Sequence, residues 1–395
     1  MGNQNITKKD KNNDSSSNTE VLGKDLKQSN ICCLGQVKYK DNYYASIGLY
    51  DGKIEVYDTN NLTLVANYIS FEDDYPGYIH YLHDNIFITT GSKVFIFAIY
   101  KNKNYSNKNN KESILELKYN IELIQEITYP IQNNIEYYPT NFLKSFIFDR
   151  NLHKKYDMYE TYNENIDSKE EELIINCDKG ILIFKRNADN NSDKNEEDNF
   201  EIDYYKYNWK KNPYIYKQNL SSINNYDIEQ VNYKYIASTV DNYVLLYSME
   251  DYEVITKYEV KVSRYSYKIM FMLTDNILII GGDDTITLIS IKDFEISLIS
   301  TIKPNYQINE ICILPDSNII IGIAYKDENI KKDELICQYK YYSTINKSTN
   351  KLEHNIYQIS SDLLTKNDSN ISFECINNCL ITIIEKRYIL SYIAK

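Results

Sequence analysis

Glycine is scarce in this sequence, with only 11 among 395 residues. Loops that hold phosphate groups through backbone amides need several glycines at fixed spacing, as in Gly-x-Gly-x-x-Gly or Gly-x-x-x-x-Gly-Lys-Ser/Thr. Neither pattern occurs, and the Gly-x-Ser-x-Gly turn of many hydrolases is also missing. We therefore expect no cofactor, and no catalytic motif is evident.

Residues that bind metal ions are also few or badly spaced. Only four histidines are present, and His80 and His83 would point to opposite faces of a strand because they are three residues apart. The seven cysteines, at 32, 33, 177, 312, 337, 375 and 379, include no Cys-x-x-Cys pair. We expect reduced thiols in an apolar core and no metal site.

Long apolar runs are absent as well. No segment approaches the roughly 18 consecutive apolar residues of a membrane-spanning helix. The first 30 residues are polar and lack the apolar stretch of a secretory signal. These features predict a cytoplasmic protein with no transmembrane segment.

Positive charge is in deficit, since the chain has a net charge of −12. Nucleic acids and anionic lipids would on average repel such a chain, so nucleic-acid binding is not expected. The N-terminus resembles a myristoylation signal at Gly2, but Ile6 stands where Ser or Thr is preferred. An unmodified Gly2 is favoured; the alternative, a myristoylated lipoprotein, would associate only weakly and reversibly with membranes.

What the sequence does contain is a repeated unit of short strands rich in β-branched and aromatic residues, separated by Asp, Asn or Gly. Asp51–Asp58 (Asp-Gly-Lys-Ile-Glu-Val-Tyr-Asp) is its best copy, and Asp241–Ser248 and Asp283–Ser290 follow the same plan. Weaker copies are Gly91–Phe97, Asp178–Phe184 and Glu385–Ser391, and a seventh unit runs from Ile308 to Cys337. An apolar strand precedes each copy, and the spacing suits a four-stranded unit of about 40–45 residues.

The repeats predict an all-β protein, a seven-bladed β-propeller over residues 19–395 that follows a disordered tail over residues 1–18. Polar insertions are expected near 101–111, 151–168, 187–199 and 344–351. The last unit has only three strands before the chain ends, whereas Thr19–Leu26 is left over before the first unit. We therefore expect Thr19–Leu26 to supply the missing outer strand.

The Asp51–Asp58 segment resembles the end of a WD repeat, with Tyr57 in the place of the tryptophan and Asp58 in that of the aspartate. Over residues 19–395 the chain resembles a divergent WD-repeat β-propeller protein. Gly-His pairs are missing and Trp209 is the only tryptophan. The family's buried His–Asp–Ser/Thr–Trp network is therefore not carried over to this chain.

The resemblance implies a non-enzymatic scaffold, an adaptor or subunit that binds other proteins in a multiprotein complex. The alternative is a propeller-fold hydrolase with its site at the central channel. Scarce histidine and glycine favour the scaffold.

A candidate partner-binding stretch interleaves basic and aromatic residues, which are common at protein interfaces. Its members are Tyr204, Tyr205, Tyr207, Trp209, Lys210 and Lys211. The alternatives are an ordinary outer strand with its loop and, less favoured in an acidic chain, a surface that stacks RNA bases.

Overall fold

A computed structural model describes the strands and most of the short turns between Glu20 and Ile393. The positions outside the described residues are 1–19, 27–29, 70–74, 84, 104, 106–116, 130, 133–134, 137–144, 149–171, 178–179, 186–213, 218–224, 233, 262–269, 275–276, 283–284, 293, 303–307, 314–318, 327–334, 343–351, 360–370, 377–378, 385–387 and 394–395. The tail over 1–18 with Gly2, the stretch Tyr204–Lys211, and the expected insertions at 151–168, 187–199 and 344–351 therefore lie outside them, as does most of 101–111. These expectations stay predictions.

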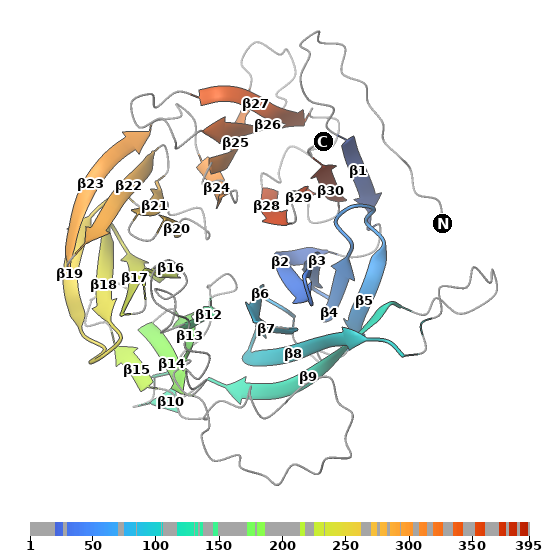
Figure 1. Cartoon of the computed structure of the whole chain (residues 1–395), viewed down its shortest axis with the longest axis horizontal. Coiled ribbons are helices and arrows are strands. Elements are labelled where there is room, and N and C mark those ends of the chain that lie inside the picture. Colours follow the sequence, from blue (N-terminus) through green and yellow to red (C-terminus); the bar gives the residue numbers. More distant parts are fainter. Residues whose placement is uncertain are drawn as a thin grey trace, which may run out of the picture. The chain divides into compact units, whose positions relative to one another are not determined.

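The chain forms two compact units, of which the first comprises residues 1–126, 326–337 and 358–395. Its sheets lie side by side in Figure 1, with β2, β6 and β28 adjacent and β5, β9 and β1 at the far edges. Their strands are β2 (Ile31–Tyr39), β3 (Asn42–Leu49), β4 (Lys53–Tyr57) and β5 (Leu64–Ile69); β6 (Tyr78–His83), β7 (Ile86–Thr90), β8 (Lys93–Lys101) and β9 (Tyr119–Thr128); and β28 (Ile371–Ile376), β29 (Cys379–Ile384) and β30 (Tyr388–Ile393) with β1 (Glu20–Asp25).

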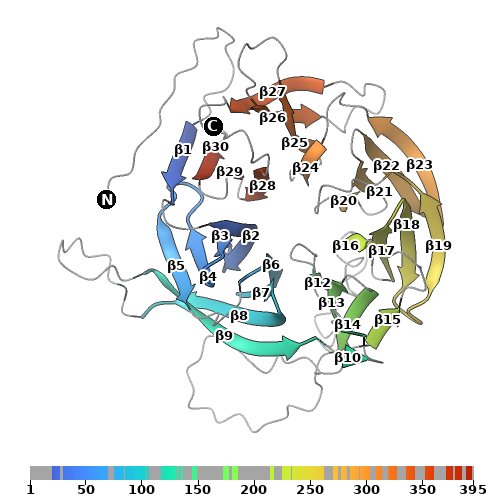
Figure 2. The same ribbon diagram turned by 180° about the vertical axis from the view of Figure 1, so that it is seen from behind.

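The second unit comprises residues 127–325 and 338–357. Figure 2 shows two of its sheets next to one another, with their fourth strands, β19 and β23, side by side. The strands are β12 (Ser145–Phe148), β13 (Glu172–Cys177), β14 (Gly180–Lys185) and β15 (Tyr214–Lys217); β16 (Asn225–Gln230), β17 (Tyr235–Val240), β18 (Tyr243–Ser248) and β19 (Val254–Glu259); and β20 (Met270–Thr274), β21 (Ile277–Gly281), β22 (Ile286–Lys292) and β23 (Glu295–Ile302).

One more four-stranded sheet consists of β24 (Ile308–Ile313), β25 (Ile319–Lys326), β26 (Leu335–Tyr342) and β27 (Leu352–Ile359). A two-stranded hairpin, β10 (Ile131–Gln132) with β11 (Ile135–Glu136), completes the strands of the described residues. The described part of the chain thus forms seven four-stranded antiparallel sheets and contains no helix that could cross a membrane. The all-β prediction is confirmed.

The predicted repeat marks the same place in six of the seven four-stranded sheets. Its copies form the third strands β4, β8, β14, β18, β22 and β30. The predicted role of the leftover N-terminal segment is also confirmed, because β1 pairs antiparallel with β30, from Glu20 opposite Ile393 to Asp25 opposite Tyr388. β1 therefore supplies the fourth strand of the sheet that contains β28, β29 and β30.

The cores of both units lie between neighbouring sheets. In the first unit, Val37 and Val56 from one sheet pack with Ile79 and Phe97 from the next. In the second, Leu246 packs with Ile280 and Ile289 in the same way. In each of these two pairs, one sheet thus covers an apolar face of the other, which an isolated four-stranded sheet would expose to water.

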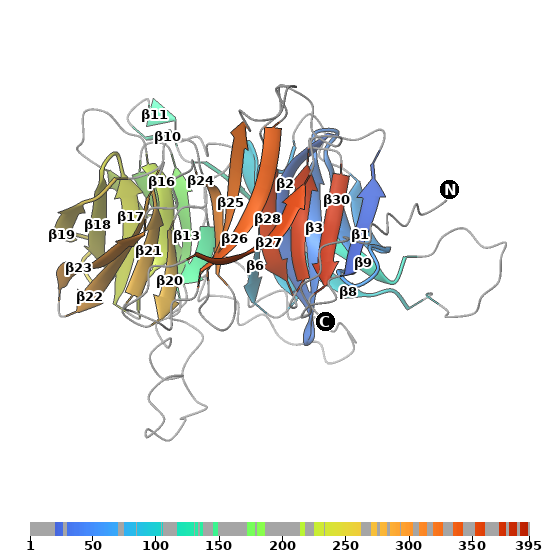
Figure 3. The ribbon, with the colours of Figure 1, turned by 90° about the horizontal axis from the view of Figure 1, so that it is seen from above.

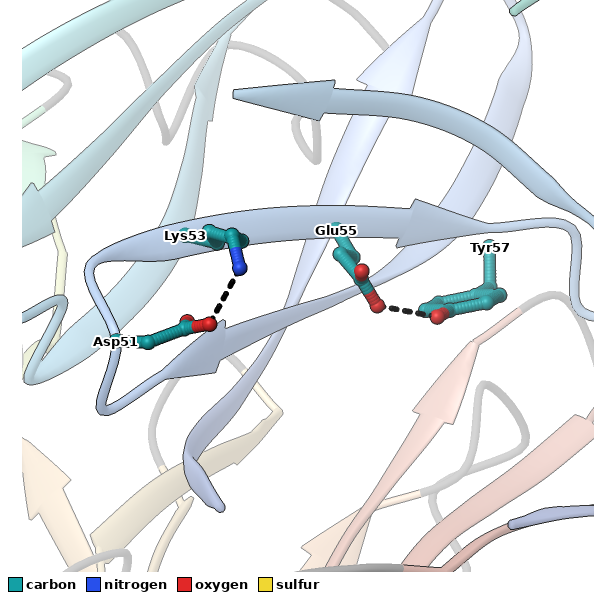
Figure 4. A network of polar contacts seen from close by, with 4 residues as sticks. All are labelled: Asp51, Lys53, Glu55 and Tyr57. Atoms are coloured by element: carbon teal, nitrogen blue, oxygen red, sulfur yellow. Dashed lines mark hydrogen bonds and ion pairs between the residues drawn. The ribbon is translucent and has the colours of Figure 1, made fainter. Parts of the chain in front are cut away.

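The WD-like segment shows how such a third strand is held (Figure 4). Gly52, at a φ of 78°, forms the turn from β3 to β4, and the Lys53 ammonium pairs with Asp51 at 2.5 Å. At the other end of β4, the buried Tyr57 donates its hydroxyl hydrogen to Glu55. Burial, with help from Glu55, raises the pKa of Tyr57, so its hydroxyl remains a donor at neutral pH.

In two sheets, the first strand (β16 or β2) also forms a hydrogen bond to the next sheet. Asp227, fully buried on β16, accepts hydrogen bonds from the backbone amides of Ile228 (2.8 Å) and Met270 (2.9 Å), the latter on β20. On β2, the Cys33 thiol donates to the carbonyl oxygen of Pro76, just before β6, at 3.1 Å. Each contact joins two sheets by a buried polar bond.

We predict that Asp227→Ala destabilises the fold, because it leaves two buried amide donors without an acceptor, at about 1–3 kcal/mol for each. Urea unfolding measures the change. Asp227→Asn keeps one acceptor oxygen and should lose less stability. A change within about 0.5 kcal/mol for Asp227→Ala, as for an ordinary surface substitution, would contradict the proposed bridging role.

Candidate interaction surface

Lysines and tyrosines gather at one end of the first two sheets of the first unit, around the turn between β2 and β3. We name this group the tyrosine–lysine surface; its members are Lys38, Tyr39, Lys40, Tyr43, Tyr44, Tyr81, Lys118 and Tyr119. They come from β2, β3, β6 and the start of β9, except that Lys40 lies in the turn between β2 and β3 and Lys118 lies just before β9. Figure 3 shows β2 and β3 from the side, with their connections at the two ends of the sheet.

The β2–β3 hairpin sets one half of this surface. Lys38 lies opposite Tyr43 in the register of the two strands, so both side chains are on the same face. The Lys38 ammonium lies 5.1 Å from the centre of the Tyr43 ring and 5.8 Å from that of Tyr81. The two rings meet edge to face, 5.8 Å apart. This half therefore joins the first sheet to the second.

The other half rests on two buried tyrosines. The hydroxyl groups of Tyr44 and Tyr119 share a hydrogen bond of 2.7 Å, and Tyr119 also packs against Tyr39 with ring centres 4.8 Å apart. The Lys118 ammonium lies 4.9 Å above the Tyr119 ring, and Lys40, exposed at the turn, lies 5.6 Å from the Tyr39 ring. The cations thus lie over a rigid aromatic base.

Electrostatically, the three lysines are available to an outside anion. The ion pairs of the described residues are Lys53–Asp51, Lys93–Glu126 and Lys185–Glu172, so none of the three ammonium groups pairs with a described carboxylate. Among the described acidic residues, Asp41 lies at the hairpin turn and Asp58 acts electrostatically on Tyr119.

Burial changes the pKa values of the tyrosines that lie beneath the lysines. Burial, and next the hydrogen bond with Tyr119, raises the pKa of Tyr44 to about 12. Burial also raises the pKa of Tyr119. Both hydroxyl groups therefore stay protonated at neutral pH and add no negative charge beside the lysines.

A second exposed feature is the edge strand β23 in the second unit. One of its edges has no strand partner among the described residues. Leu298 and Ile299 are 52% and 42% exposed, although side chains normally alternate along a strand, because a bulge opposite Leu288 and Ile289 interrupts the register. No charged residue occurs from Ile296 to Ile302, whereas edge strands usually carry charges that prevent aggregation.

The structure places the sequence-predicted residues only in part. Tyr204, Tyr205, Tyr207, Trp209, Lys210 and Lys211 lie outside the described residues, so their role stays a prediction. His80 stacks on Tyr78, with ring centres 5.9 Å apart. Within the described ranges, no three His, Cys, Asp or Glu side chains form a metal-ligand group. The hydrolase alternative is untested and also stays a prediction.

Sequence reasoning missed the tyrosine–lysine surface, although its signal was present. Residues 38–44 read Lys-Tyr-Lys-Asp-Asn-Tyr-Tyr, the same mixture of basic and aromatic residues that singled out the stretch at 204–211. The contribution of Lys118 and Tyr119 could not be foreseen, because Tyr119 lies 75 positions from Tyr44 in the chain.

Comparisons with known proteins bear on the fold. Neither a protein-family model nor a curated protein matches the sequence. The crystal structure of the β-propeller domain of Cps50 (Swd1) from Myceliophteria thermophila is similar, with a TM-score of 0.54 and 8% sequence identity over 95% of this chain and 99% of that one. The chain therefore has the β-propeller fold, and its resemblance to WD-repeat propellers is confirmed at the level of the fold. In all, 1048 solved chains match, so the fold by itself does not define a function.

We predict that Tyr44→Phe makes stability less sensitive to alkaline pH. The folded chain holds the Tyr44 proton more tightly than the unfolded chain, whose tyrosines titrate near about 10. The stability from this group is complete below that pH and is lost as the pH rises through about 12. Urea midpoints measured across this window should fall less steeply in Tyr44→Phe. Tyr50→Phe, at an exposed tyrosine, is the control; equal slopes for Tyr44→Phe and the unchanged protein would contradict the prediction.

We also predict that Leu298→Lys reduces aggregation, because it places a charge on the exposed apolar edge of β23. Light scattering of concentrated protein measures the effect. Ile69→Lys is a matched control, because Ile69 is 62% exposed at the end of β5 but is preceded on that strand by more covered side chains. Equal improvement in both variants would show that added charge, rather than the β23 edge, is responsible.

Proposed function

We propose that this propeller is a non-enzymatic protein-binding scaffold, and that its tyrosine–lysine surface holds an acidic segment of a partner. The observation that carries the proposal is the set of three lysines, each above a tyrosine ring and none paired with a described carboxylate. A propeller suits such a role, because variable loops and strand ends are displayed on a stable framework.

The chemistry of the surface specifies the partner. Ammonium groups attract carboxylates, and the half-buried rings of Tyr43 and Tyr81 add apolar contact area with little loss of side-chain entropy. Lys38 and Tyr81 come from different sheets, but the Lys38 ammonium lies 5.8 Å from the centre of the Tyr81 ring. One bound peptide would therefore contact both sheets. We also propose that the protein is cytoplasmic, as the sequence predicts, and that it belongs to a multiprotein complex. The alternative in which Gly2 carries myristate would add weak membrane association.

The test measures binding of a fluorescent Asp/Glu-rich peptide by anisotropy, with the matching Asn/Gln peptide for comparison. Exposed charge pairs each contribute up to about 1 kcal/mol, so Lys38→Glu, Lys40→Glu and Lys118→Glu together should weaken binding by about tenfold or more. Binding should also weaken as salt is added. Only the acidic peptide should bind well.

The control reverses the same number of charges elsewhere, with Lys53→Glu, Lys93→Glu and Lys185→Glu, whose ammonium groups lie beside acidic residues of the chain itself. This variant should bind as the unchanged protein does. A third variant changes Trp209, Lys210 and Lys211 to Ala. Loss of binding in this third variant alone would move the site to the 204–211 stretch and contradict our assignment; no binding of the acidic peptide to the unchanged protein would overturn the proposed partner class.

A further inference from the structure

Two adjacent thiols in the first unit converge on one carbonyl oxygen. The Cys32 and Cys33 sulfur atoms lie 2.9 Å and 3.1 Å from the backbone oxygen of Pro76. The two sulfur atoms therefore lie within about 6 Å of each other, and Cys32 packs against the cluster of buried residues that contains Cys33. Neither thiol forms a disulfide in this structure.

This convergence is unusual for neighbours in a strand, whose side chains normally point to opposite faces. The register of β2 against β3 explains it. Ile31 pairs with Leu49 and Cys33 with Gly48, so Cys32 is an extra residue in a bulge. A bulge sets two successive residues against one on the partner strand and redirects a side chain.

The surroundings leave room for the sulfurs and keep one of them accessible. A side chain on Gly48 would collide with the Cys33 sulfur, at 2.5 Å, and with the ring of Pro76. Cys33 is 9% exposed, whereas Cys32 is half-buried. A reagent from solvent therefore reaches Cys32 first and finds Cys33 beside it.

We propose that Cys32 and Cys33 form a two-sulfur binding site for a soft, thiophilic metal or metalloid ion. Thiolates prefer soft ions, and no third His, Cys, Asp or Glu ligand joins them among the described residues. The site therefore suits an ion that needs only two sulfur ligands. Binding would withdraw both S–H donors from the Pro76 oxygen, so occupancy of the site would alter the link between β2 and the segment before β6.

The test uses phenylarsine oxide, whose arsenic binds two thiols at once. Each of the two S–H groups gives up its proton, two As–S bonds form, and the bond between arsenic and oxygen breaks. The oxygen leaves with the two protons as one water molecule, with no change in oxidation state. The folded protein should bind one phenylarsenic group per chain, as measured by intact mass and by protection of two thiols from alkylation. Excess ethanedithiol should remove it.

The variants separate this site from the other cysteines. Cys32→Ser and Cys33→Ser should each abolish the stable adduct, while a hydroxyl group remains to donate to Pro76. Cys379→Ser, and the double variant that also changes Cys375, should bind as the unchanged protein does. Circular dichroism checks that each variant is folded.

Two outcomes would overturn the proposal. One is an adduct that persists in both Cys32→Ser and Cys33→Ser, which would place the dithiol elsewhere. The other is an adduct that forms only after the chain is unfolded in guanidinium, where any two adjacent cysteines can reach one arsenic atom. The binding must therefore belong to the folded chain.

Discussion

Packing of one four-stranded sheet against the next is the constraint on which the rest of this structure depends. The residues of each core come from two sheets: Val37 and Phe97 meet across the first and second sheets, and Leu246 and Ile280 across the sheets of β16–β19 and β20–β23. No sheet could cover both of its own faces. The repeats in the sequence therefore have a physical purpose, since each copy supplies apolar surface to a neighbour built on the same plan.

Apolar packing is not directional, so the alignment of neighbouring sheets needs further contacts. In both units these come from a bulged first strand. The bulge that precedes Cys33 on β2 recurs before Asp227 on β16, and each residue reaches the start of the following sheet. The chemistry is complementary in each case: a carboxylate faces the Met270 amide, whereas a thiol donor faces Pro76, whose nitrogen carries no hydrogen.

Features set by local sequence could be predicted, whereas features set by the register and packing of strands could not. Strand positions and the pairing of β1 with β30 followed from local alternation and from counting strands in the first and last units. Bulges depend on the register between two strands, which no local pattern specifies. The contact of Tyr43 with Tyr81 depends on how two sheets pack, so the tyrosine–lysine surface was visible only as an unassigned Lys-Tyr-Lys segment.

The first sheet shows how this chain fills the place that tryptophan has in a WD repeat. Tyr57, in the place of the tryptophan, is buried, donates to Glu55 and lies under the Lys24 ammonium of β1 at 4.4 Å. Burial lowers the pKa of Lys24, and the Glu55 carboxylate partly offsets that effect. The cation of β1 thus holds the third strand of the adjoining sheet.

Asp58, in the place of the aspartate of a WD repeat, stabilises the turn after β4. Asp58 accepts a hydrogen bond from the Asn60 amide at 2.9 Å and, through its backbone oxygen, one from Leu62 at 2.9 Å. These bonds shape the turn that leads into β5. A propeller can therefore form without the side-chain network of WD repeats, provided that an aromatic residue fills the space between sheets and the turn beside it is closed.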